Sequence, residues 1–159
     1  MCEFTIDQTW NLIYRASQDG FESVNFHLKC DNKQNTLVII KSTNGNIFGG
    51  YTEQSWGGND IDPYNRNSFI FSLINTLDKP IKIKWSNGIQ ISCDSNQGPA
   101  FGCVDIHISN KSNTNDYNYA ELGSSYTHPD YAYNSIKAKS FLAGTNSFQV
   151  SEIEVFTKQ

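Results

Sequence analysis

The feature that most constrains the fold is the stretch Thr36–Trp56, TLVIIKSTNGNIFGGYTEQSW. Its first half, Leu37–Ile40, is continuously apolar, as expected for a strand that is covered on both faces. Asn44-Gly45 follows, and this pair is the strongest short signal for a tight hairpin turn, because both central residues of a type I′ turn need a positive φ. The stretch therefore predicts a buried β-hairpin around which the rest of the chain is arranged.

Two adjacent glycines lie in the second strand of this hairpin. A two-residue turn predicts that Ile40 lies opposite Gly49 and that Ile39 lies opposite Gly50. Glycine weakens a strand interior, so such a pair indicates a bulge or a close approach by another group. We expect aromatic side chains from elsewhere in the chain to pack on Gly49 and Gly50. The alternative is a ligand that approaches the backbone there.

The segments before the hairpin predict a strand and a helix. Trp10–Arg15 has strand composition, with Trp10, Leu12 and Tyr14 on one face. Asp19-Gly20 then predicts a turn. A short helix is expected from Ser23 to about Lys29, with an apolar face made of Phe21, Val24 and Leu28.

Further strands follow the hairpin. Ser68–Ile74 is apolar enough for a buried strand. Ile81–Cys93 predicts a second hairpin with a three-residue loop at Ser86–Gly88, which sets Trp85 opposite Ile89. The side chains expected to face water there are Lys82, Lys84 and Gln90.

The last third adds two alternating segments. Gly98–Gly102 is expected to be a turn, and Cys103–Ser109 alternates cleanly between apolar and polar residues. In Phe148–Phe156 the alternation breaks near Ser151-Glu152, which predicts a β-bulge. Together these patterns favour a mainly β (α+β) fold, an antiparallel two-sheet β-sandwich flanked by one or two short helices. We expect one domain over residues 1–159, with residues 1–9 as a short lead-in.

Composition excludes several classes of protein. The 159 residues carry a net charge of −4 and only two arginines, Arg15 and Arg66, so no basic face for nucleic acid is expected. No apolar run is long enough for a membrane span, and no signal peptide is recognised. The four cysteines match no zinc spacing and are interpreted as reduced thiols of a cytoplasmic protein.

Three groups of residues have the right types for chemistry. Asp105, His107 and Ser109 contain the members of a catalytic triad, but alternate residues on a strand lie about 6.6 Å apart, too far for direct hydrogen bonds. Their face of the strand is expected to be solvated. Glu152 and Glu154 are interpreted as a charged strand edge, with a partner-binding patch or an acid/base pair as alternatives.

Metal binding is the remaining chemical possibility. Asp60 and Asp62 lie in a loop without the full calcium-binding pattern, and nothing in the sequence supports a site built from His27 and His128. We predict no catalytic residues, no metal and no cofactor.

An ordered set of motifs resembles the TLDc domain family and covers nearly the whole chain. The motifs are LIYRASQDGF (Leu12–Phe21), IFGGYTEQSW (Ile47–Trp56), SFIFSL (Ser68–Leu73), GPAFG followed by DIHIS (Gly98–Ser109), LGSSY (Leu122–Tyr126) and FLAGTNSFQVSEIEVF (Phe141–Phe156). The resemblance implies a β-sandwich flanked by helices and without a recognised catalytic site. The family is associated with resistance to oxidative stress, and several members bind and regulate the vacuolar proton-pumping ATPase.

The resemblance suggests what the chain does and where to look. It implies a non-enzymatic interaction module with protein partners, among them subunits of the vacuolar ATPase. Longer members carry a helical segment before the position of Trp10, where this sequence has nine residues. The alternatives are a β-sandwich that binds a ligand such as a carbohydrate, and an enzyme that uses Glu152 or Glu154. Residues in matching motifs that could serve interaction are Arg15, Asp19, Gly49, Gly50, Glu152 and Glu154.

Overall fold

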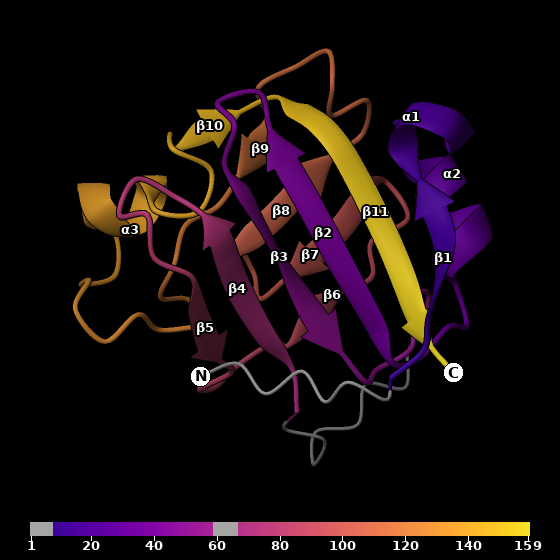
Figure 1. Cartoon of the computed structure of the whole chain (residues 1–159), viewed down its shortest axis with the longest axis horizontal. Coiled ribbons are helices and arrows are strands. Elements are labelled where there is room, and N and C mark those ends of the chain that lie inside the picture. Colours follow the sequence, from indigo (N-terminus) through magenta and orange to yellow (C-terminus); the bar gives the residue numbers. More distant parts are fainter. Residues whose placement is uncertain (1–7, 59–66) are drawn as a thin grey trace.

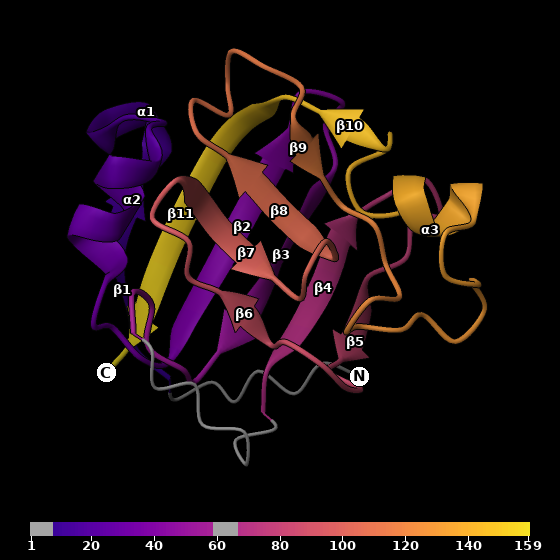
Figure 2. The ribbon, with the colours of Figure 1, turned by 180° about the vertical axis from the view of Figure 1, so that it is seen from behind.

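Two antiparallel sheets lie face to face in the computed structural model, which describes residues 8–58 and 67–159 (Figure 1). Within these residues the first sheet has six strands, in the order β1 (Trp10–Arg15), β11 (Val150–Lys158), β2 (Thr36–Ser42), β3 (Ile47–Thr52), β4 (Phe69–Ile74) and β5 (Ile81–Lys84). The second, in front in Figure 2, has five, in the order β10 (Ser147–Phe148), β9 (Asn118–Tyr119), β8 (Ile106–Ser109), β7 (Gln97–Phe101) and β6 (Ile91–Ser92). The predicted β-sandwich is confirmed.

Short helices lie beside the sheets rather than over them. Helices α1 (Ala16–Asp19) and α2 (Ser23–Cys30) lie at the β1 edge, and α3 (Ile136–Ser140) lies beyond the opposite edge (Figure 1). None of the helices in residues 8–58 and 67–159 is long and apolar enough to cross a membrane.

The opening hairpin forms, but its turn differs from the predicted one. The loop has three residues, because the Ser42 N–H donates to the Asn46 carbonyl (3.0 Å) and the Gly45 N–H to the Ser42 carbonyl (3.0 Å). Gly45 takes the left-handed conformation (φ 88°), which only the third position of such a loop requires. The pairing is therefore shifted by one residue from the prediction: Gly49 faces Ile39 and Gly50 faces Val38.

This register sets which side chains form the core. One row of cross-strand partners runs over the inner face of the six-stranded sheet, consisting of Tyr14, Val155, Val38, Gly50, Ile70 and Ile83. A β-bulge between Leu12 and Tyr14 turns Tyr14 inward, so the predicted shared face of Trp10, Leu12 and Tyr14 is wrong. From the second sheet, Phe101 packs directly on Gly50.

The second predicted hairpin is wrong. Strand β5 pairs with β4 in the first sheet, whereas β6 pairs with β7 in the second, so the chain between them crosses from sheet to sheet. Ile83 and Ile91 both point to the core, but from opposite layers. Lys82 and Lys84 are exposed as expected. Gln90 is buried instead, with its side-chain oxygen accepting from the Ser68 hydroxyl (2.7 Å).

Two further predictions need correction. The segment predicted as a turn at Gly98–Gly102 is mostly β7, a buried strand in which Pro99 lies where the pairing with β8 shifts register. In α2 the buried residues include Phe26 and Cys30. Val24 and Leu28 face solvent, so the predicted apolar face lies on the wrong side of the helix.

Candidate functional site

Four of the predicted interaction residues come together at the corner where β1 meets α1. Arg15 Nε donates to Glu154 Oε1 (2.8 Å), and Nη2 lies 2.7 Å from the same oxygen. Glu152 Oε1 accepts from the Ser17 N–H (3.0 Å). Asp19 Oδ2 accepts from the Arg15 N–H (2.9 Å). Residues from the two ends of the chain thus form one polar network.

The predicted bulge in β11 explains part of this geometry. The pairing of β11 with β2 shifts between Val150 and Glu152, and after it Ile153 and Val155 point into the core. Glu152 and Glu154 therefore point outward together, as predicted. The interpretation of a charged edge is wrong, because β11 lies between β1 and β2 and is not an edge strand.

The polar network supplies hydrogen-bond acceptors for N–H groups at the start of α1. A helix leaves its first N–H groups without intrahelical partners, and the N-cap residue Arg15 makes no side-chain cap. Glu152 and Asp19 accept two of the N–H groups at this end. The pKa of Asp19 is lowered, first by the N–H of Arg15 and then by Lys29, whose Nζ lies 3.1 Å from Asp19 Oδ1. Glu152 and Asp19 therefore have a clear structural role.

The exposed part of the corner combines charge and apolar surface. On α2, one turn apart, Val24 is 64% and Leu28 is 82% exposed. Leu28 adjoins Lys29, whose ion pair with Asp19 joins α2 to α1. We refer to Arg15, Asp19, Val24, Leu28, Lys29 and Glu154 as the corner surface.

Gly49 and Gly50 lie away from this corner, in the middle of the six-stranded sheet. A Cβ on Gly50 would meet the Phe101 ring at 2.6 Å, and one on Gly49 would meet the Val38 carbonyl oxygen and, at 3.1 Å, the Phe71 ring. Aromatic side chains therefore occupy the space over both glycines, as predicted.

Asp105, expected on a solvated face, is fully buried. Its carboxylate accepts the backbone N–H groups of four consecutive residues in the loop before α3, at 2.8–3.1 Å, namely Gly123, Ser124, Ser125 and Tyr126. Burial raises the pKa of Asp105, and these N–H groups act in the opposite direction. The carboxylate organises this loop rather than orienting His107.

The other members of the dismissed triad are also engaged elsewhere. The His107 ring lies 6.0 Å from that of Tyr119, and burial lowers the pKa of His107. The Ser109 hydroxyl oxygen lies 2.8 Å from Asn115 Oδ1 and 3.1 Å from Asn118 Oδ1, either of which can accept its proton. The three side chains thus serve separate local contacts.

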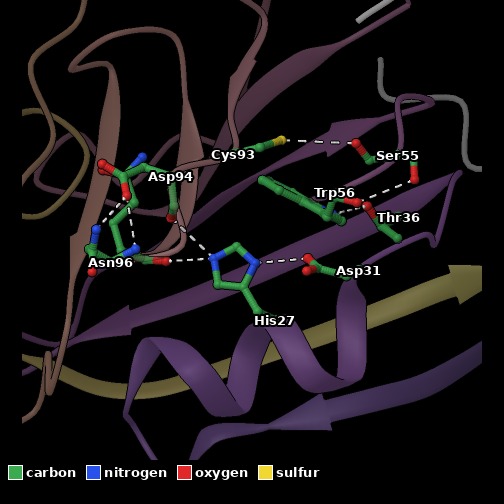
Figure 3. A network of polar contacts seen from close by, with 9 residues as sticks. His27, Asp31, Thr36, Ser55, Trp56, Cys93, Asp94 and Asn96 are labelled. Atoms are coloured by element: carbon green, nitrogen blue, oxygen red, sulfur yellow. Dashed lines mark hydrogen bonds and ion pairs between the residues drawn. The ribbon is translucent and has the colours of Figure 1, made fainter. Parts of the chain in front are cut away.

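His27 links α2 to the second sheet (Figure 3). Its Nδ1 lies 2.8 Å from Asp31 Oδ1, and its Nε2 lies 3.1 Å from the carbonyl oxygens of Asp94 and Gln97. His128 lies elsewhere, stacked on Tyr131 at 3.9 Å. Among residues 8–58 and 67–159, no three His, Cys, Asp or Glu side chains are grouped to hold a metal. Asp60 and Asp62 lie outside the described residues.

Sequence reasoning missed one feature of the surface. Trp10, Tyr51, Phe69 and Phe71 line a cavity of about 200 Å³ on the outer face of the six-stranded sheet. The signal was present in strands that are apolar at consecutive positions, such as Leu37–Ile40 and Phe69–Phe71. We interpreted that signal as cover by a second layer, yet Leu37 and Ile39 remain half-exposed.

Comparison with known proteins is consistent with this architecture. The TLDc domain model matches residues 2–159. A search of curated proteins found no match. Since the matched region covers essentially the whole sequence, the chain belongs to the TLDc domain family.

Proposed function

We propose that this TLDc domain is a non-enzymatic, cytoplasmic interaction module that protects against oxidative stress, regulates the vacuolar proton-pumping ATPase, or does both, through contact with protein partners. The observation that carries the proposal is how the polar groups of chemical interest are used. Asp105 holds a loop, Glu152 holds the start of α1, and His27 holds α2 to the second sheet. These structural roles support the proposal of an interaction module.

The corner surface is the part of the scaffold best suited to a partner. Leu28 and Val24 offer apolar area that the fold leaves in water, and a helix that presents such residues one turn apart can dock in a groove of another protein. Around them the Arg15–Glu154 and Lys29–Asp19 pairs place both signs of charge at the rim. We propose that a subunit of the pump contacts this surface.

The test is affinity purification from cell lysate with the partners identified by mass spectrometry. Leu28→Asp should abolish recovery of pump subunits, because it places a charge in the centre of the contact. Ile136→Asp is the matched control, since Ile136 is 86% exposed on α3 beyond the opposite edge of the sheet. Recovery of no pump subunit by the wild-type domain would remove the pump from the proposal. An equal loss from both variants would refute the corner surface.

A further inference from the structure

The outer face of the six-stranded sheet is unusually apolar for a face that none of the helices in the described residues covers. Antiparallel sheets with one open face normally alternate apolar residues inside with polar residues outside. Here the outer row of cross-strand partners consists of Leu12, Phe156, Leu37, Tyr51, Phe69 and Lys84. In Figure 1 this face is turned toward the reader, and α1, α2 and α3 all lie to its sides.

The apolar face is hollowed at one end. The cavity of about 200 Å³ is lined by Trp10, Leu37, Tyr51, Phe69 and Ile81, among others. An apolar cavity of about 150 Å³ is enough to hold benzene. The space therefore fits one substituted ring or a short alkyl chain, and it is too small for an extended polymer.

The rings are arranged around the space rather than as a flat platform. Trp10 stands at 86° to Tyr51, with ring centroids 6.2 Å apart, and Tyr51 leans at 29° on Phe69 at 5.3 Å. A sugar ring is recognised by a flat exposed ring together with several polar groups. The lining here is dominated by apolar side chains, which favours an apolar ligand body over a carbohydrate.

The charges at the cavity have one sign, although the chain as a whole is negative. The charged side chains of the lining are Lys82 and Lys158, and no Asp or Glu among the described residues lines it. Lys82 Nζ lies 3.8 Å from the centroid of the Phe69 ring. Neither lysine forms an ion pair within residues 8–58 and 67–159. Both are exposed cations at the rim, and both would attract an anion there.

The acidic side chain of Glu53 contacts the lining residue Tyr51, but Glu53 itself does not line the cavity. Glu53 Oε1 lies 3.5 Å from the Tyr51 hydroxyl, and its other oxygen accepts from the Asn67 amide (3.0 Å). Burial, with Glu53 beside it, raises the pKa of Tyr51 to about 12, so this ring stays neutral at physiological pH.

We propose that this cavity binds a small amphiphilic carboxylate, whose apolar body of one ring or about eight carbons lies among the aromatic side chains and whose carboxylate lies at the rim, where Lys82 and Lys158 supply the positive charge. This binding site is independent of the corner surface and goes beyond the proposed function. The volume of the cavity limits the apolar part of the ligand, and the two lysines favour a negatively charged head group.

Calorimetric titration of the full chain with three eight-carbon probes tests the proposal. Octanoate should bind with sub-millimolar affinity, octan-1-ol more weakly, and octylamine at least about tenfold more weakly than octanoate, since its charge is repelled by the lysines. Lys82→Glu and Lys158→Glu should each weaken octanoate binding about five- to tenfold. Thermal unfolding checks that each variant is folded.

The matched control is Lys84→Glu. Lys84 lies two residues from Lys82 on the same strand and the same outer face, but it does not line the cavity. It should leave octanoate affinity within twofold of the wild type. The proposal is overturned if octanoate does not bind, if octylamine binds equally well, or if Lys84→Glu and Lys82→Glu have the same effect. A wild-type dimer that Lys82→Glu dissociates would assign this face to a second copy, and would overturn it as well.

Discussion

Glu152, on the last strand, accepts a hydrogen bond at 3.0 Å from the backbone N–H of Ser17, 135 positions earlier in the chain. The same carboxylate oxygen also accepts from the N–H of Ile153 (3.0 Å). A carboxylate is thus the cap of α1, supplied by a strand that pairs with β1 rather than by the residue before the helix. The contact ties the two ends of the domain together.

Removing this cap should cost measurable stability. We expect Glu152→Ala to lower the free energy of unfolding by about 1 kcal/mol, the usual cost of losing a helix N-cap. Glu152→Gln keeps an oxygen acceptor and should lose clearly less. Urea denaturation followed by circular dichroism measures both. Equal losses from the two variants would show that the charge, not the hydrogen bond, matters.

Asp19 should make the domain sensitive to acid. Its pKa is lowered in the folded state, first by the Arg15 N–H and then by Lys29, from an ordinary value of about 3.9. A lowered pKa of an acid contributes stability that is present above the ordinary value and is lost as pH falls through the folded-state value. Wild type should therefore be more stable than Asp19→Asn at pH 7, and this difference should shrink as the pH falls below the ordinary value of about 3.9.

The cause of the Asp19 effect can be separated with a second variant. Lys29→Met removes the ion pair but leaves the backbone N–H of Arg15 in place. Since the N–H is the larger cause, Lys29→Met should reduce the acid-dependent difference only in part. Chemical denaturation at several pH values gives both results, and a complete loss in Lys29→Met would reverse the assignment.

Replacing Gly50, in the centre of the sheet, should cost less stability when its aromatic partner Phe101 is replaced as well. A Cβ at Gly50 would lie 2.6 Å from two carbons of the Phe101 ring, so Gly50→Ala should destabilise by about 1–3 kcal/mol. Phe101→Leu, which removes the ring, should recover part of this loss in the double variant. Gly45→Ala is the control: it meets no atom within 4 Å, and its cost comes from φ 88°. That cost should not change with Phe101→Leu.

What could be predicted from the sequence was local. The bulge near Ser151 depends on the order of apolar residues along one strand, and it is present as expected. Aromatic packing on Gly49 and Gly50 follows from the lack of a side chain, and it too is present. The bulge is determined by neighbours along the chain, whereas the two glycines indicate only that aromatic side chains pack there, and not that Phe101 is the one over Gly50.

The predictions that were wrong depended on contacts between residues far apart in the sequence. Ile83 and Ile91 have the alternation of a hairpin, but alternation only assigns a residue to the core and not to a layer. Asp105 is buried because four N–H groups from residues 123–126 satisfy it, and no sequence pattern connects them. Glu152 and Glu154 were placed on the correct face, but β1 covers the edge that was expected to be open.

The cysteines offer a test of how the domain relates to oxidative stress. Cys30 is buried and Cys93 is half-buried, and burial raises the pKa of both thiols, whereas Cys103 is exposed. The thiolate is the form that reacts with alkylating agents and peroxides. Iodoacetamide should therefore modify Cys103 in the native protein at least about tenfold faster than Cys30 or Cys93, as read by mass spectrometry of individual peptides. Comparable rates for Cys30 or Cys93 would contradict this. In Cys103→Ser, hydrogen peroxide should oxidise neither Cys30 nor Cys93, as read on the same individual peptides.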